Sequence, residues 1–223
     1  MQFPWYQRLL SYVVPIRLEQ LHGVHNPHLE VHLSKGRIQL STANAIYSHE
    51  DLYSNFKLSF DRMSRHLVSI NNMLILGFGL GSIPNMLEKH FKQQIHYTAV
   101  DIDETILSLA YQYNIKFLES AITSICADAS LFVEQCQETF DMVCIDLFMD
   151  DQIPVDFSTQ DFLEQVQHLI PKHGWILYNC LGAKKEDIQR SMAFFEGPFR
   201  TVFPEAIYLE VDRNFMLINR PID

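Results

Sequence analysis

The sequence of 223 residues has few cysteines, few basic residues and no long uninterrupted apolar run. Its four cysteines are far apart and form no CxxC pair, which argues against a zinc ribbon or a disulfide framework and indicates a reducing compartment. Lysine and arginine together number 17 against 27 acidic residues, so the net charge is -10. Nonspecific nucleic-acid binding needs a basic face, and an anionic membrane repels an acidic protein. We therefore expect neither a nucleic-acid partner nor a membrane partner.

The first residues, "MQFPWYQRLLSYVVPIR", have no basic start, and their apolar stretch is interrupted by Ser11 and Tyr12. This pattern is neither that of a secretory signal nor that of a membrane span. Together with the scattered cysteines, it predicts a cytoplasmic protein.

Short β-rich runs alternate with helical patterns from Met73 onward, which is typical of an α/β protein with a mostly parallel sheet. Ser158 is expected to cap the helix that begins beside it. Residues 199–220 lack a helical period and predict two closing strands, in an antiparallel hairpin at the sheet edge. Strands are expected within 73–77, 95–101, 121–128, 140–146 and 174–182, and helices within 82–91, 103–114, 129–136 and 157–170.

The first seventy residues have a different pattern. Residues 29–42 predict two strands joined by the turn "SKG", and residues 47–67 predict a helix. The chain is therefore expected to divide into residues 1–70, a small β subdomain with a linking helix, and residues 71–223, a Rossmann-like domain.

Histidines at positions 22, 25, 28 and 32 raise the question of a metal site. Gly23, Asn26 and Pro27 interrupt this run, so no helix would hold the imidazoles on one face. We expect turn and strand histidines exposed to solvent, and no metal.

Alternating glycines follow the strand at 73–77 and precede a helix, in "LILGFGLGSI". Such a turn lets a ligand approach the backbone closely. A dinucleotide fingerprint would need a third glycine where Ser82 stands, and a phosphate-binding loop would need a lysine much nearer than Lys89. Both of these readings fit poorly, and the turn alone identifies no ligand.

Acidic residues end the strands that follow the glycine turn. Asp101 is placed to accept hydrogen bonds from both ribose hydroxyls of an adenosine, because a carboxylate only accepts and can engage two donors. Asp128 lies where it, or its neighbouring backbone, would read the adenine amino group. Asp146 falls at the crevice where open α/β sheets bind substrates. Asp103 is better explained as a helix start.

These segments resemble a known family. "LILGFGLGS", "AVDIDE", "ICADAS" and "FDMVCIDLF" are similar to the successive motifs of class I S-adenosylmethionine-dependent transferases, and more narrowly to the spermidine synthase branch. That branch has an apolar residue where Ile75 stands, whereas ordinary methyltransferases commonly have an acid. The segment "LSKGRIQLSTANAIYSHEDLY" also resembles the N-terminal strands of the branch. The resemblance extends from about Leu29 to Asn219.

The resemblance implies a class I methyltransferase fold with a small N-terminal β subdomain and a transferase activity. The cofactor would be S-adenosylmethionine or its decarboxylated form, and the partner a small-molecule acceptor. Members of the family often form dimers, which makes a homodimer an option by analogy. Asp146 would be the catalytic acid, and the cofactor contacts would come from Gln39, Tyr47, Gly77, Gly79, Gly81, Asp101, Ile102, Asp128 and Ala129.

Departures from the family pattern bear on the reaction. Aminopropyltransferases have an acid where this chain has Leu80, and a second catalytic acid where it has Met149; Asp150 and Asp151 come one and two places late. A segment that contributes a tyrosine to the amine site is missing near the C-terminus. Because an unpaired ammonium is costly to bury, these losses disfavour a diamine acceptor. Methyl transfer to a small acceptor is therefore favoured over aminopropyl transfer, with a non-catalytic binding protein as a third alternative.

Overall fold

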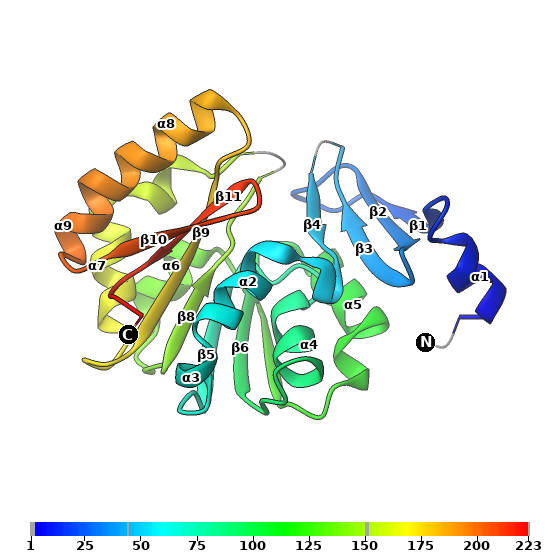
Figure 1. Ribbon diagram of the computed structural model, residues 1–223, viewed down its shortest axis with the longest axis horizontal. Coiled ribbons are helices and arrows are strands. Elements are labelled where there is room, and N and C mark those ends of the chain that lie inside the picture. Colours follow the sequence, from blue (N-terminus) through cyan, green and yellow to red (C-terminus); the bar gives the residue numbers. More distant parts are fainter. Residues whose placement is uncertain (1–2, 44, 150–151, 223) are drawn as a thin grey trace.

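The computed structural model describes residues 3–43, 45–149 and 152–222, and within them the chain forms two β-sheets flanked by helices (Figure 1). A large mixed sheet forms the body of the molecule, and a smaller antiparallel sheet packs at one side of it. No helix in this described part has the length and the apolar character needed to span a bilayer.

The large sheet has the strand order β10-β11-β9-β8-β5-β6-β7 in the described part of the chain. β5, β6, β7, β8 and β9 are parallel, and β11 runs antiparallel to β9 and to β10. The predicted antiparallel edge hairpin is confirmed. The strands are β5 (Asn72–Leu76), β6 (His96–Asp101), β7 (Ile122–Cys126), β8 (Met142–Ile145), β9 (Trp175–Leu181), β10 (Ile207–Val211) and β11 (Asn214–Ile218).

The order in which strands are added to the sheet changes side at β5. The next two strands along the chain, β6 and β7, lie on one side of it, and β8 and β9 lie on the other. The loops that leave neighbouring strands diverge at such a point and open a crevice at the carboxyl edge, where open α/β sheets bind ligands. The glycine turn follows β5 directly, so it lies at this crevice.

Helices cover both faces of the large sheet, so its central strands β5, β8 and β9 are buried on both sides. Met73 and Ile75 of β5 pack in one core, and Leu74 and Leu76 pack in the other, as the two-residue period of a strand requires. The helices are α1 (Trp5–Leu10), η1 (Glu50–Leu52), α2 (Ser54–Arg62), α3 (Ser64–Leu67), α4 (Ser82–Lys89), α5 (Glu104–Tyr113), η2 (Ile115–Phe117), α6 (Ala129–Gln135), η3 (Val155–Ser158), α7 (Gln160–His168), α8 (Lys185–Phe194), η4 (Phe195–Phe199) and α9 (Arg200–Val202).

Side-chain caps start several of these helices. Asp103 caps α5 by accepting a hydrogen bond from the Thr105 amide, which confirms the predicted helix-start role. The cap predicted at Ser158 was wrong by one residue, because the Thr159 hydroxyl accepts from the Phe162 amide at the start of α7. The hairpin predicted from 199 begins only at Ile207, since residues up to Val202 are helical.

The small sheet has the order β1-β2-β3-β4 within the described residues, where two strands were predicted. Its strands are β1 (Ile16–Leu21), β2 (Leu29–Ser34), β3 (Arg37–Ser41) and β4 (Ile46–Ser48). The helix expected over 47–67 was wrong at its start: β4 and η1 come first, and α2 begins at Ser54.

Both sheets share one hydrophobic core. Leu29, Val31 and Leu40 of the small sheet pack in the same cluster as Met73 and Ile75 of the large one. The proposed division at residue 70 falls between α3 and β5. It divides the sequence between the two sheets, but side chains from both sides of the division pack in the same core.

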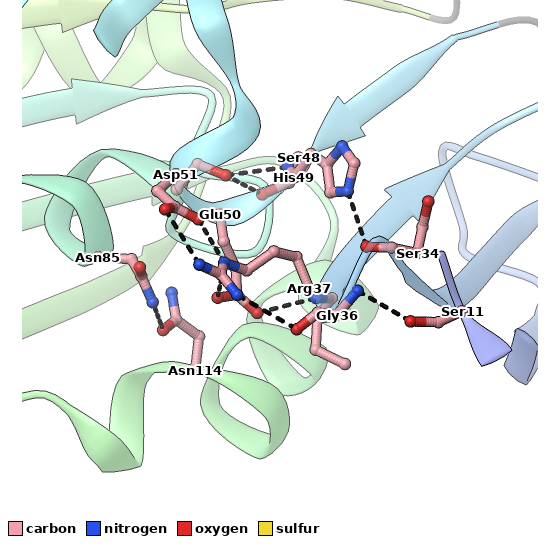
Figure 2. Close-up of polar contacts among 12 residues, drawn as sticks. Ser11, Ser34, Gly36, Arg37, Ser48, His49, Glu50, Asp51, Asn85 and Asn114 are labelled. Atoms are coloured by element: carbon pink, nitrogen blue, oxygen red, sulfur yellow. Dashed lines mark hydrogen bonds and ion pairs between the residues drawn. The ribbon is translucent and has the colours of Figure 1, made fainter. Parts of the chain in front are cut away.

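Polar contacts hold the small sheet and α4 together. The hydroxyls of Ser48 and Ser82 lie 2.6 Å apart, and the His49 amide donates to Ser82 Oγ at 3.1 Å. In the same region, Figure 2 shows Arg37 paired with Asp51, where Nε and an Asp51 oxygen lie 2.5 Å apart. Because Ser82 is the first residue of α4, these contacts position β4 over the end of the glycine turn.

Candidate active site

A cavity of about 200 Å³ opens at the carboxyl edge of β5, β6, β7 and β8, at the expected crevice; we call it the inner cavity. Most residues that the sequence singled out for cofactor binding or catalysis line it. These are Tyr47, Gly77, Gly79, Asp101, Ile102, Asp128, Ala129 and Asp146.

The glycine turn has a left-handed backbone. Gly77, Gly79 and Gly81 have φ angles of 83°, 54° and 76°, which L side chains rarely adopt. At Gly77 a Cβ atom would also lie 2.2 Å from the backbone oxygen of Asp146. The turn after β5 and the end of β8 are therefore packed backbone against backbone.

Asp101 holds the glycine turn from the end of β6. Its Oδ2 accepts hydrogen bonds from the amides of Phe78 and Gly79, both at 3.1 Å, and its Oδ1 accepts from the Asp103 amide at 3.1 Å. Burial nevertheless raises the pKa of this carboxyl to about 6, against the effect of these donors. A carboxylate offers about four acceptor positions, so Oδ1 can take a further donor from a ligand.

Asp128 sits at the end of the next strand, as the N-cap of α6. Its Oδ1 accepts from the amides of Ser130 and Leu131, at 2.9 and 3.1 Å. The second oxygen has no such amide partner among the described residues and can accept from a ligand. Ile102 and Ala129 line the cavity beside it and provide an apolar surface of the kind that contacts a planar base.

Asp146, at the end of β8, receives two side-chain hydrogen bonds. Tyr53 Oη donates to it at 2.9 Å, and Asn179 Nδ2 donates to Oδ1 at 2.7 Å. Asn214 Nδ2 in turn donates to the side-chain oxygen Oδ1 of Asn179 at 2.8 Å. Burial raises the pKa of Asp146 to about 7, the two donors oppose this rise, and the charge of Asp101 adds to it. The carboxyl can therefore take up or release a proton near neutral pH.

A second cavity, of about 500 Å³, adjoins the first; we call it the outer cavity. It lies between the small sheet, the start of α2, the end of β9 and the β10–β11 turn. Tyr47 and Phe148 line both cavities, while Tyr53 and Asn179 line the outer one. Asp146 thus lines the inner cavity and receives its side-chain donors from the wall of the outer cavity.

The small sheet closes over the inner cavity through Tyr47. Its hydroxyl donates to Asn26 Oδ1 at 3.0 Å and lies 3.4 Å from the Phe148 carbonyl oxygen. Asn26 Nδ2 approaches Asp103 Oδ2 at 3.4 Å, so the loop between β1 and β2 also reaches this edge.

The inner cavity is acidic. Asp101, Asp128, Asp146 and Asp156 line it, and among its described lining residues there is no lysine, arginine or histidine. A cation is favoured in such a cavity, because it compensates carboxylates that burial would otherwise leave unpaired. A sulfonium ion with an adenosine group suits these residues, which supply acceptor oxygens and an apolar surface.

Two of the predicted cofactor residues do not line the inner cavity. Gln39 donates through its amide to Ser41 Oγ at 2.7 Å, and Gly81 is the N-cap residue of α4. Their contacts with a cofactor stay predictions. Asp150 and Asp151 lie outside the described residues. No group of three or more His, Cys, Asp or Glu that could hold a metal occurs in the described part of the chain.

Sequence reasoning missed Tyr53 and Asn179. Asn179 had a signal, since it is a polar residue inside the apolar run "GWILYNCLG", and a buried amide needs a partner. Tyr53 had none, because only the packing of α2 against the large sheet brings its hydroxyl to Asp146.

Fold comparison places the chain among Rossmann-like class I methyltransferase folds. A probable spermidine synthase from Corynebacterium glutamicum matches with a TM-score of 0.72, 16% identity and coverage of 91% of this chain and 78% of that one. Human methyltransferase-like protein 13, in complex with SAH, matches with a TM-score of 0.58, 22% identity and coverage of 73% and 78%. These likenesses establish the fold.

Sequence comparison narrows the class. No family model matches the chain. A polyamine aminopropyltransferase from Vibrio vulnificus is 26% identical over 137 residues, 60% of this chain and 44% of the relative. An N-terminal histidine N-methyltransferase from Emericella nidulans is 30% identical over 117 residues, 50% of this chain and 20% of the relative. The chain thus spans less than half the length of these curated relatives. The resemblance to class I S-adenosylmethionine-dependent transferases, and to their spermidine synthase-like branch, is confirmed.

Proposed function

We propose that this chain is a transferase that binds S-adenosylmethionine or its decarboxylated form in the inner cavity. The observation that carries the proposal is an acidic cavity beside a glycine turn, at the point in the sheet where the strand order changes side. A buried carboxyl, that of Asp146, lies between this cavity and the outer one. Related transferases and the bound SAH of a structural neighbour agree with it.

In this proposal Asp101 accepts from the ribose hydroxyls and Asp128 from the adenine amino group. Ile102 and Ala129 contact the base, and the turn at Gly77 and Gly79 lies under the methionine part. Each assignment uses a group that lines the inner cavity and has free acceptor capacity or apolar surface. Gln39, Tyr47 and Gly81 complete the proposed contacts by family resemblance.

A bound sulfonium supplies an electrophilic carbon and a neutral thioether leaving group. The acceptor's lone pair forms the new bond to that carbon, and the electrons of the broken C–S bond stay on sulfur. The outer cavity would hold the acceptor in line with this bond, which accounts for much of the rate. Asp146 would orient the acceptor and take its proton, and Tyr53 and Asn179 would hold Asp146 in position.

Methyl transfer to a small acceptor is the favoured reaction. Leu80 is buried in the hydrophobic core rather than facing a ligand, and Val211 pairs directly with Asn214, which leaves a tight turn between β10 and β11. The acid that aminopropyltransferases have at the position of Leu80, and their inserted segment, are therefore absent from these described positions.

Aminopropyl transfer, a step of polyamine biosynthesis, is the second candidate. The specific observation for it is the lack of a basic side chain among the described residues that line the inner cavity, because such a group would pair the carboxylate of S-adenosylmethionine. The decarboxylated form needs no such partner. The third candidate, a non-catalytic binding protein, requires that the same cavity bind ligand without turnover. We propose a cytoplasmic location for each.

Thermal-shift titration separates these candidates. The full chain is titrated with S-adenosylmethionine, its decarboxylated form, their two thioether products and NAD, since a ligand that binds only the folded state raises the Tm. We expect a shift with the adenosyl sulfur compounds and none with NAD. A larger shift with the decarboxylated form would favour aminopropyl transfer. No shift with any sulfur compound would overturn the proposal.

Two variants test which residue binds the cofactor and which residue acts in turnover. Asp101→Ala should abolish the shift, whereas Asp146→Ala should keep it and lose turnover. Because Asp101 also holds the glycine turn, circular dichroism must show that Asp101→Ala is folded. A folded Asp101→Ala variant with an unchanged shift would contradict the assignment of the inner cavity.

A further inference from the structure

A third cavity, of about 200 Å³, lies between α1, the small sheet, α4 and α5; we call it the side cavity. It has about the volume of the inner cavity, and it shares no described lining residue with the inner or the outer cavity. It is therefore separate from the proposed cofactor and acceptor sites. Its walls combine charges of both signs with apolar side chains.

Two cations line the side cavity. They are Arg8 of α1 and Lys89 of α4, and both residues are exposed. Neither forms an ion pair with an acidic side chain in the part of the chain that the structure describes. Their charges are thus available to a carboxylate, which a guanidinium pairs with especially well.

A carboxylate with remaining acceptor capacity lines the same cavity. Glu50 Oε1 accepts from the Ile38 amide at 2.8 Å. Its Oε2 lies 3.8 Å from Arg37 Nε, whose closer partner is Asp51 at 2.5 Å (Figure 2). Glu50 Oε2 can therefore accept from a donor group of a ligand.

Asn85 adds a neutral acceptor to this wall. The residue is 2% exposed, and its Nδ2 donates to Asn114 Oδ1 at 2.6 Å. Figure 2 shows Asn85 Oδ1 turned away from Asn114, and this oxygen accepts from no donor among the described residues. Because Asn85 lines the side cavity, a ligand there can donate to this oxygen.

We propose that the side cavity binds a free amino acid with an apolar side chain. A ligand with only one sign of charge would meet a like charge on the wall, whereas an α-amino acid carries both signs. Its carboxylate pairs with Arg8 and Lys89. Its ammonium donates to Glu50 Oε2 and Asn85 Oδ1. Its side chain contacts the apolar part of the wall, which includes Phe3, Leu33, Ile38 and Phe117.

Two carboxamides connect the side cavity with the glycine turn. Asn85 donates to Asn114 Oδ1, as described above. Asn114 Nδ2 donates in turn to the carbonyl oxygens of Leu80 and Gly81, at 2.9 and 2.8 Å. A ligand that holds Asn85 therefore also orders the end of the turn, so a second ligand in the inner cavity has less conformational entropy to lose. Occupancy of the side cavity strengthens the binding of S-adenosylmethionine, a consequence that rests on the proposed function; the amino-acid site itself does not.

Thermal shift of the full chain with leucine, methionine and phenylalanine tests the site. We expect at least one of them to raise the Tm. Analogues of that amino acid without the ammonium or without the carboxylate, which for leucine are 4-methylpentanoate and isoamylamine, should bind about tenfold more weakly, because each loses charged hydrogen bonds. No shift with any of the three amino acids, or an analogue that binds as tightly as its parent, would overturn the proposal.

Removing the two cations tests where the amino acid lies. Arg8→Gln with Lys89→Gln should abolish the shift, and the fold should be kept because both residues are exposed. The matched control, Arg65→Gln with Lys172→Gln, removes the same charge at exposed positions outside the side cavity and should keep the shift. A shift that persists without Arg8 and Lys89, or that disappears in the control, would refute the assigned place.

Isothermal titration calorimetry with S-adenosylmethionine measures the coupling. In the presence of a saturating amount of the same amino acid, the Kd of the natural chain should fall about fivefold or more. The Kd of the Arg8→Gln, Lys89→Gln variant should not change. An unchanged Kd in the natural chain would overturn the link through the two carboxamides. A Tm that rises with the amino acid but with no adenosyl sulfur compound would refute the proposed function and support the amino-acid site.

Discussion

At the scale of single residues, Asp146 has the most informative environment. Its carboxyl is held by Tyr53 and Asn179 and is buried enough to bring its pKa to about 7. In the unfolded chain an aspartate titrates near pH 4. Folding therefore takes up a proton between these two values, and stability must depend on pH over that range.

The sign of this dependence follows from the raised pKa. Between about pH 4 and pH 7 the folded chain binds more protons at Asp146 than the unfolded chain, so stability falls as the pH rises. An asparagine at this position stays neutral, so Asp146→Asn removes the part of the fall in stability that is due to Asp146. In urea unfolding between about pH 5 and pH 8, the midpoint concentration of the variant should change less with pH than that of the natural chain. Part of the slope should persist, because burial also raises the pKa of Asp101.

Two further variants check the cause. Tyr53→Phe removes a donor that favours the charged carboxyl, so the decline should extend to higher pH. Asp156→Asn, at an exposed carboxyl that lines the same cavity, should keep the slope of the natural chain. Identical slopes for the natural chain and Asp146→Asn would refute the assigned protonation.

At the scale of elements, the glycine turn and the end of β8 form one backbone-packed unit. Gly77 cannot carry a Cβ without meeting the Asp146 carbonyl at 2.2 Å, whereas at Gly79 the nearest atom would be 3.3 Å away. Both residues have positive φ angles, so they share the same conformational penalty for an L residue. Only Gly77 has the additional backbone clash.

This difference can be measured directly. Gly77→Ala should destabilise the fold by about 2 to 4 kcal/mol, from left-handed strain plus overpacking against a backbone that cannot move freely. Gly79→Ala should lose about 1 to 2 kcal/mol, from the strain alone. Urea unfolding of both variants gives the comparison. Equal losses would mean that the turn and the β8 end are not packed as described.

Much of the element order was predictable from the sequence, because parallel strands buried on both faces leave apolar runs that local patterns reveal. The strands beginning near Met73 and Trp175 are examples. β1 and β4 were missed since their side chains are only partly buried and give no continuous run. Asp101, Asp128 and Asp146 were identifiable because each lies at the carboxyl end of a predicted parallel strand. Tyr53 depended on tertiary packing and was not.

At the scale of the whole molecule, the two sheets depend on each other. Leu29, Val31 and Leu40 of the small sheet share a hydrophobic cluster with β5, and Ser48 contacts the start of α4. A division of the chain near residue 70 is thus a boundary between sheets that remain packed together. Removing either one would expose apolar surface that the other now covers.

Truncation tests this dependence. A chain of residues 71–223 should lose cooperative unfolding and bind a hydrophobic dye, because its cluster loses the β2 and β3 side chains. The full chain should unfold in one transition when followed by circular dichroism and by tryptophan fluorescence. A fragment that unfolds cooperatively on its own would show that the boundary separates two independent folding units.

The tight turn between β10 and β11 has a consequence for how this scaffold can change. Asp212 and Arg213 form this turn, are exposed and line the outer cavity, whereas Gly77 and Gly79 of the glycine turn line the inner cavity. Longer or different sequences inserted there would add side chains to the outer cavity while β5 through β8 stay intact. If the proposed function is right, the recognition of new acceptors can evolve, or be engineered, separately from the residues that would bind the cofactor.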